Sequence, residues 1–146
     1  GRQAYTQVGR VQPKCVILAD RHTALAIGLR GMLETSFQTV FIVADAMSLR
    51  EGTLHLLPAL VILDLQLAGS DSLDLVRDIR ELSPGTRVIG LSMHEQTAVA
   101  RLALESGASA VITKHSLGSE FLPAIDAVLN GQEYISLDFN LTDSAH

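Results

Sequence analysis

Four residues with useful chemistry each stand directly after a short apolar run of the chain. They are Asp20, Asp64, Ser92 and Lys114. A carboxylate can attack phosphorus as a nucleophile, and carboxylate oxygens are ligands that Mg²⁺ accepts. A hydroxyl and an ammonium group can bind the remaining phosphoryl oxygens. If these four side chains converge, the set suits transfer of a phosphoryl group to a carboxylate, with Asp64 as the nucleophile.

The strongest of these apolar runs is residues 60–64, which read Leu-Val-Ile-Leu-Asp. Four aliphatic residues in a row predict a strand that is buried on both faces, as in a parallel sheet. Asp64 then lies at the carboxyl end of a central strand, where open α/β sheets place their binding sites. Taken alone, Asp64 could equally cap a turn. The three other runs that end in the same way favour a site.

Strands and helices are predicted to alternate five times along the chain. The strands are expected at residues 14–19, 38–44, 60–64, 87–91 and 109–113, with a helix after each. Short connections and right-handed crossovers then give an α/β fold with helices on both faces of the sheet. We expect a five-stranded parallel sheet of the flavodoxin-like order 2-1-3-4-5.

Several local signals predict how the helices begin and end. Ser48 and Glu51 form a capping-box pattern for the second helix, and Asp71 is expected to cap the third. Pro123 lies inside the last helix, so its first turns should be irregular or kinked. Asn130 and Gly131 should end that helix.

Composition excludes several classes of protein. The chain has 146 residues, of which 47% are hydrophobic, too many for a disordered chain. No apolar run is long enough to span a membrane. The net charge is -5 and there is no cluster of Lys and Arg, so this segment is not expected to bind nucleic acid. Cys15 is the only cysteine, which excludes an internal disulfide and makes a cytoplasmic location the default.

The chain is expected to form one domain over residues 14–135. Residues 1–13 are interpreted as a flexible lead or a cloning remnant. Residues 136–146 are polar and are expected to be a frayed tail, at the start of a linker to a domain that this chain does not include.

Four motifs occur in register at the ends of the predicted strands. They are Ala19-Asp20-Arg21-His22, Leu63-Asp64, Leu91-Ser92-Met93-His94, and Ser106-Gly107-Ala108-Ser109-Ala110 leading to Lys114. With them, the chain resembles the receiver domain of two-component response regulators, over roughly residues 14–134. It is most similar to the NarL/FixJ group of transcription factors, whose receivers precede a LuxR-type helix-turn-helix domain. Gly28-Leu29-Arg30 and residues 127–131 carry that closer similarity.

The resemblance implies a role for each site residue. Asp64 would accept phosphate from a histidine kinase, and Asp20, Asp64 and the backbone carbonyl of Gln66 would hold Mg²⁺. Ser92 and Lys114 would sense the phosphoryl oxygens and switch the face formed by the fourth helix, the fifth strand and the fifth helix. Such a domain is a signalling module and not an enzyme. Its partners would be the kinase, a C-terminal DNA-binding domain and a second copy of the chain.

Arg21 departs from the family, which usually has a second acid at this position. The usual pocket holds three carboxylates and one lysine, a net charge of about -2. With Arg21 directed inward, Asp20 and Asp64 face Arg21 and Lys114, and the net charge is about zero. Arg21 could form a salt bridge with Asp64 or Asp20 and occupy part of the metal's space, or it could turn to solvent. With Arg21 directed inward, Mg²⁺ binding and phosphorylation of Asp64 would be weakened or absent. With Arg21 in solvent, the affinity for Mg²⁺ would only be reduced. The alternative function is therefore a pseudo-receiver that acts through protein–protein contacts without phosphorylation.

Two further departures bear on output. Val111 replaces the Tyr or Phe that usually precedes the lysine by three residues, so a swinging ring is absent and output needs another coupling. Ala68 replaces a common proline, so the loop after Asp64 is expected to be looser.

His22, His94 and His115 match no zinc spacing. A flavodoxin-like nucleotide-binding protein remains the alternative from another class, but it lacks a glycine-rich loop after the first strand.

Overall fold

Strand β3 (Pro58–Asp64) lies at the centre of the fold and is buried at every residue. The computed structural model describes residues 11–93 and 95–139. β3 pairs in parallel with β1 (Gln12–Ala19) on one side and with β4 (Arg87–Ser92) on the other. A strand with parallel neighbours on both sides and helices on both faces must be apolar throughout. The interpretation of residues 60–64 as a buried central strand is confirmed.

The sheet has six parallel strands in the order β2-β1-β3-β4-β5-β6, so the prediction of five strands is wrong by one. The order of the first five strands is as predicted. They include β2 (Thr39–Val43) and β5 (Ala110–Thr113). The sixth, β6 (Tyr134–Ile135), pairs with Ala110 and Val111 of β5. Two residues are too few to give a recognisable alternation in the sequence.

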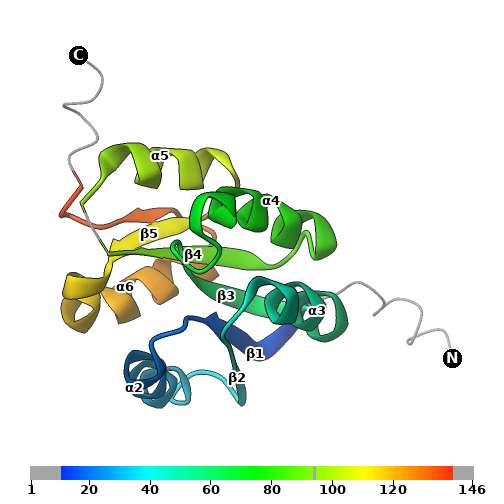
Figure 1. The fold of residues 1–146 in the computed structure, drawn as a ribbon. Helices are drawn as coiled ribbons and strands as arrows, with labels where there is room; N and C mark the ends of the chain where they lie inside the picture. Colours follow the sequence, from blue (N-terminus) through cyan, green and yellow to red (C-terminus); the bar gives the residue numbers. More distant parts are fainter. Residues whose placement is uncertain (1–10, 94, 140–146) are drawn as a thin grey trace, which may run out of the picture.

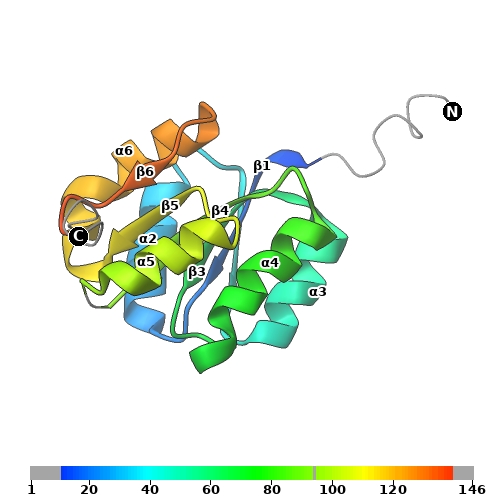
Figure 2. The ribbon, with the colours of Figure 1, turned by 90° about the horizontal axis from the view of Figure 1, so that it is seen from above.

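Helices cover both faces of the sheet, as predicted (Figures 1 and 2). One face carries α2 (Thr23–Leu33) and α6 (Leu117–Leu129). The other carries α3 (Ala46–Leu56), α4 (Ser72–Leu82) and α5 (Thr97–Glu105).

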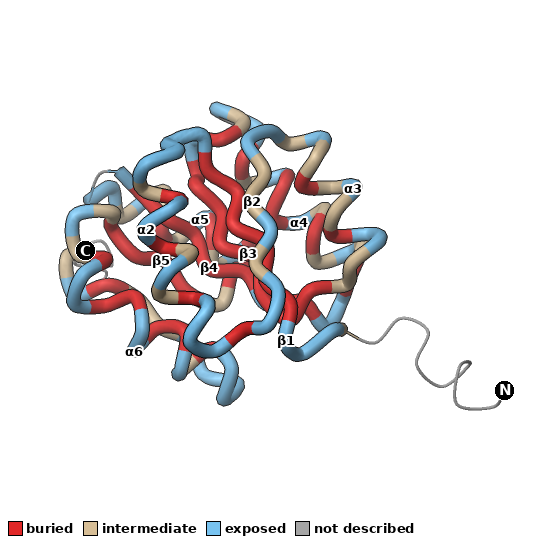
Figure 3. The backbone as a smooth tube through the Cα atoms, turned by 90° about the horizontal axis from the view of Figure 1, so that it is seen from below, coloured by how far each residue is buried: buried red, intermediate tan, exposed pale blue. Residues whose placement is uncertain are grey.

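Alternation along the strands divides the core into two layers. In β1, Val16 and Leu18 pack toward α2 and α6, whereas Ile17 and Ala19 pack toward α3 and α4. This is the period of two that a strand imposes on its side chains. In Figure 3, β3 and β4 run through the middle of the fold as continuously buried segments.

Two of the predicted helix starts differ from the structure. Helix α3 begins one turn earlier than the capping box predicted, because Asp45 is the N-cap and its carboxylate accepts a hydrogen bond of 2.7 Å from the Ser48 amide. Before α4, a 3₁₀ turn (Gly69–Asp71) intervenes, and the Asp71 side chain makes no capping hydrogen bond. The Ser72 hydroxyl instead accepts from the Ala68 amide at 3.2 Å.

The last helix differs from its prediction at one end only. A 3₁₀ turn (Lys114–Ser116) leads into α6, which then continues through Pro123 without interruption. The irregular segment therefore precedes the helix. At the other end, Gly131 has a φ of +83°, a conformation that favours glycine, as the predicted stop requires.

The chain remains packed beyond the expected end of the domain. Ser136 is 1% exposed and Phe139 is 7% exposed, so the prediction of a frayed tail is wrong for residues 136–139. Residues 140–146 lie outside the described residues, as do residues 1–10 of the expected lead. Gln12 and Pro13 of that lead already belong to β1. No helix in the described ranges is long and apolar enough to cross a membrane.

Candidate functional site

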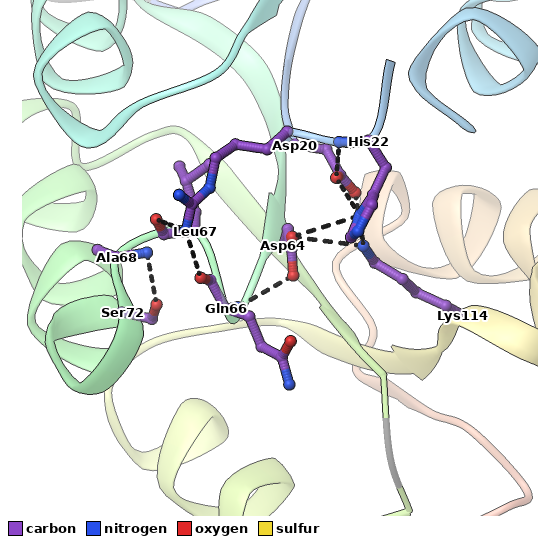
Figure 4. Close-up of polar contacts among 9 residues, drawn as sticks. Asp20, His22, Asp64, Gln66, Leu67, Ala68, Ser72 and Lys114 are labelled. Carbon is purple, nitrogen blue, oxygen red and sulfur yellow. Dashed lines mark hydrogen bonds and ion pairs between the residues drawn. The ribbon is translucent and has the colours of Figure 1, made fainter. Parts of the chain in front are cut away.

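The structure brings Asp20, Asp64 and Lys114 together at the carboxyl edge of the sheet (Figure 4). The Lys114 amine lies 2.9 Å from Asp20 Oδ2 and 3.3 Å from Asp64 Oδ2. All three side chains are almost completely buried. They come from β1, β3 and the end of β5, and parallel strands deliver such residues to one edge. The predicted convergence of these three side chains is confirmed.

Lys114 compensates two carboxylates that would otherwise repel each other. Asp20 Oδ2 is buried and makes no hydrogen bond to the described residues, so its contact with the amine is an ion pair without hydrogen-bond geometry. A buried charge needs a partner of opposite sign. One lysine shared between two carboxylates leaves the cluster with one net negative charge.

The second oxygen of each carboxylate fixes the turn that follows its strand. Asp20 Oδ1 accepts a hydrogen bond of 2.8 Å from the His22 amide. Asp64 Oδ1 accepts one of 3.0 Å from the Gln66 amide. Such bonds to the amide two residues on are typical of Asp in turns. Each aspartate therefore positions its own loop with one oxygen and contacts Lys114 with the other.

His22 belongs to the cluster, a contact that its place in the motif after the first strand did not predict. Its Nδ1 lies 2.9 Å from Asp20 Oδ1, 2.9 Å from the Lys114 amine and 4.0 Å from Asp64 Oδ2. Nδ1 can accept from Lys114 or donate to Asp20, but one nitrogen does not do both at once. The only signal in the sequence was its place two residues after Asp20.

Arg21 is exposed, as in the second of the two arrangements predicted for it, but its guanidinium contacts the neighbouring loop. Among the described residues it forms no ion pair with Asp20 or Asp64. Its guanidinium donates to the backbone carbonyl of Leu67 at 3.1 Å and to that of Gln66 at 3.4 Å. Arg21 therefore ties the loop after β1 to the loop after β3, and it contacts the carbonyl that was expected to bind Mg²⁺.

Ser92 lies at the end of β4, one residue after Leu91, which pairs with Asp64. It is buried and lines a cavity of about 190 Å³ together with Gln66, Gln96 and Val99. The cavity lies between the loops that follow β3 and β4. Ser92 thus ends the strand next to that of Asp64, at the same edge of the sheet, and lines this cavity.

The remaining predicted positions are placed as follows. Val111 is fully buried in β5, between Gly90 of β4 and Ile135 of β6. His94 lies outside the described residues. His115 contacts Glu95 and Asp138 through Nε2 at 3.3 and 3.2 Å, on the outside of the cluster.

The fold and the cluster define a class of protein. A flavodoxin-like parallel sheet with two aspartates and a lysine at its carboxyl edge is the arrangement of receiver domains. The sequence matches the response regulator receiver domain over residues 16–126, and the chain belongs to that family. The resemblance drawn from the motifs is confirmed.

Similar proteins include several transcriptional regulators. The transcriptional activator protein ExaE of Pseudomonas putida is 32% identical, over 82% of this chain and 57% of its own length. The response regulator GacA of Pseudomonas protegens is 28% identical, over 83% of this chain and 58% of its own length. The chain thus spans somewhat more than half of the curated relatives that it matches.

Solved structures agree with this assignment. A LuxR-family response regulator from Aurantimonas has a TM-score of 0.82 at 28% identity, covering 92% of this chain and 99% of that one. The isolated receiver domain of RcsB from Salmonella enterica has a TM-score of 0.77 at 23% identity, covering 86% and 94%. The latter likeness supports the fold alone.

The residues present do not fit the Mg²⁺ ligand set that the family implies. Asp20, His22 and Asp64 place potential ligand atoms within 4.8 Å of one another, so an acidic cluster exists. However, Lys114 lies against one oxygen of each carboxylate, and the Gln66 carbonyl accepts from Arg21. Mg²⁺ requires several oxygen ligands in near-octahedral geometry. In this arrangement the Lys114 amine lies where a metal ion would meet both carboxylates, so Mg²⁺ would need it to move.

Proposed function

We propose that the chain is the phospho-accepting receiver domain of a transcriptional response regulator, with Asp64 as the acceptor. One observation carries the proposal: the Asp64 carboxylate ends the central strand and lies 3.3 Å from the Lys114 amine. An acceptor needs a nucleophilic oxygen beside a cation that can neutralise the incoming phosphoryl group. Membership of the receiver family supports the same assignment.

The proposed reaction is transfer from a phosphohistidine of a kinase. An Asp64 oxygen attacks phosphorus, a P–O bond forms, the P–N bond breaks and its electron pair leaves with the imidazole. Lys114 then shifts from the two carboxylates to the phosphoryl oxygens, where negative charge has accumulated. Ser92, at the end of the adjacent strand β4, donates its hydroxyl to another phosphoryl oxygen.

Mg²⁺ binding is proposed to be weak in this receiver. The metal would have to displace Lys114 from the carboxylates and Arg21 from the Gln66 carbonyl. The lysine is common to the family, but the loss of the Arg21 contact and the missing second acid are particular to this chain and weaken metal binding. Phosphorylation of Asp64 is accordingly expected to depend less on Mg²⁺ than in a receiver with a second acid.

The second candidate is a pseudo-receiver that signals without phosphorylation. The contact of Arg21 with the Gln66 carbonyl supports it. With this carbonyl in contact with Arg21 and Lys114 shared between the carboxylates, the site is stabilised by its own residues without metal or phosphate. In that case the domain acts through protein–protein contacts alone.

Intact-mass spectrometry after incubation with acetyl phosphate separates the two candidates. We expect the wild-type chain to gain one phosphoryl group, with a modest response to added Mg²⁺. Asp64→Asn should gain none, whereas Asp74→Asn, a matched change of an exposed acid on α4, should behave as wild type. A wild-type chain that stays unmodified at every Mg²⁺ concentration would favour the pseudo-receiver.

The wider setting is proposed from the relatives. The partners would be a histidine kinase, a DNA-binding domain in the full-length protein, and a second copy of the chain. The location would be the cytoplasm, and the domain would have no enzymatic activity beyond its own phosphorylation.

A further inference from the structure

Asp138 holds the residues on both sides of Lys114. Its carboxylate accepts hydrogen bonds from the hydroxyls of Thr113 and Ser116, and it lies 3.2 Å from His115 Nε2. Thr113 ends β5, and Ser116 ends the 3₁₀ turn that contains Lys114. The donated hydroxyls of Ser116 and Thr113 hold the pKa of Asp138 below its ordinary value, so the carboxylate is charged. The position of Lys114 is therefore tied to a residue 24 places further along the chain.

A second carboxylate anchors the same segment at a different point. Glu120 of α6 accepts from the Tyr134 hydroxyl at 2.8 Å, from the Ser136 hydroxyl at 2.6 Å and from the Leu137 amide at 3.1 Å. We call residues 136–139, held by Glu120 and Asp138, the tail clasp. It is the last described part of the chain before residue 140.

The usual aromatic route from the site to the outer strand is absent. Val111 has no ring to rotate, and its carbonyl accepts a hydrogen bond of 2.9 Å from the Ser136 amide. Ile135 pairs with it across β6. The backbone of Val111 is thus paired with the segment that leads into the tail clasp. The contacts of Asp138 with Thr113, His115 and Ser116 are a polar connection between the residues that flank Lys114 and that segment.

We propose that Asp138 is a positioning residue that couples Lys114 to the chain beyond Phe139. When Lys114 moves from Asp20 and Asp64 to a phosphoryl group, the Lys114–Ser116 turn shifts, Asp138 loses its hydroxyl donors, and the tail clasp loosens. The phosphate dependence of this coupling rests on the proposed function. Its basis, the contact of Asp138 with the turn, does not.

The first test uses the fact that the chain has only two lysines, Lys14 and Lys114. In the lysine-labelled 146-residue chain, NMR gives one side-chain signal set for each. Asp138→Asn should move the Lys114 signals and leave those of Lys14 in place. The matched control is Asp126→Asn, which changes an exposed acid of α6 that bonds only Asn130 among the described residues. It should move neither.

Ser116→Ala serves as a milder variant if Asp138→Asn does not fold. It removes one donor to Asp138 and should move the Lys114 signals in the same direction by a smaller amount. Unchanged Lys114 signals in a folded Asp138→Asn or Ser116→Ala chain would overturn the proposal.

The second test measures amide hydrogen exchange with beryllofluoride, a mimic of the phosphoryl group. In the wild-type chain the amides of Leu137 and Phe139 should exchange at least about fivefold faster when beryllofluoride is bound. In Asp138→Asn their exchange should already be fast and should not respond. By linkage, the affinity of Asp138→Asn for beryllofluoride should differ from that of the wild-type chain by the same factor as the exchange rates.

The two proposals fail in different ways. A wild-type chain that binds beryllofluoride with unchanged exchange in the tail clasp would overturn the coupling and leave the proposed function intact. A wild-type chain that binds no beryllofluoride would contradict the proposed function. The lysine spectra alone would then decide whether Asp138 positions Lys114.

Discussion

Replacing Arg21 by Asp should convert the site into one that binds Mg²⁺ more tightly. The Arg21 guanidinium donates to the carbonyls of Gln66 and Leu67 at 3.4 and 3.1 Å. Arg21→Asp releases the Gln66 carbonyl and replaces a positive charge near the site by a negative one. Both effects favour a dication beside Asp20 and Asp64.

The size of the effect follows from Coulomb's law. Two unit charges 4 Å apart in water interact by about 1 kcal/mol. The substitution changes the charge by two units and Mg²⁺ carries two, so the product of charges is four times larger. A larger separation and screening by salt reduce this by about half. We therefore expect a gain of about 2 kcal/mol, which is roughly a 30-fold lower Kd.

Isothermal titration calorimetry with MgCl₂ measures the change directly, since the chain has no Trp to report binding by fluorescence. Arg87→Asp is the matched control, because Arg87 begins β4 at the opposite edge of the sheet and the charge change is the same. The reasoning is refuted if Arg21→Asp binds Mg²⁺ no more tightly than wild type. It is also refuted if Arg87→Asp strengthens binding equally.

Three further predictions concern stability and reactivity. Lys114→Met leaves Asp20 and Asp64 buried without a cation, so urea denaturation at neutral pH should show a loss of about 3 kcal/mol; a loss below 1 kcal/mol would contradict the ion cluster. Burial raises the pKa of Glu120, but hydrogen bonds from Ser136, Tyr134 and Leu137 outweigh it and leave the pKa below the ordinary 4.5. The stability that Glu120 contributes should thus be complete above pH 4.5 and lost as the pH falls through the lowered value, and Glu120→Gln should remove this dependence from acid-unfolding curves. Burial raises the pKa of the Cys15 thiol, so a thiol reagent should label it only after unfolding; rapid labelling of the native chain would contradict its burial.

The sequence predicted the parts of the site that follow from strand ends. Asp20, Asp64 and Lys114 each follow a buried strand, and parallel pairing then brings them to one edge regardless of loop detail. Arg21 could not be placed in this way, because its partners are backbone carbonyls 45 and 46 residues away. Backbone acceptors have no sequence signature.

The errors in the fold have similar physical causes. Asp45 and Ser48 are both good N-cap residues three positions apart, and the backbone decides which one caps. β6 is too short to show a pattern. Residues 136–139 lie in a stretch that is polar as a whole, yet they are held because Glu120 is directed inward from α6 and Phe139 is buried. A carboxylate in a helix is usually interpreted as solvent-facing, so only the structure identifies it as an anchor.

The central claim is that Asp64 accepts a phosphoryl group beside Lys114. The most direct measurement is fragmentation mass spectrometry of the wild-type chain after reaction with phosphoramidate, a small donor with the P–N bond of phosphohistidine. The account predicts a single phosphoryl group located on Asp64, and none when Asp64 is replaced by Asn. A chain that takes up no phosphoryl group, or takes it up on another residue, would contradict the account.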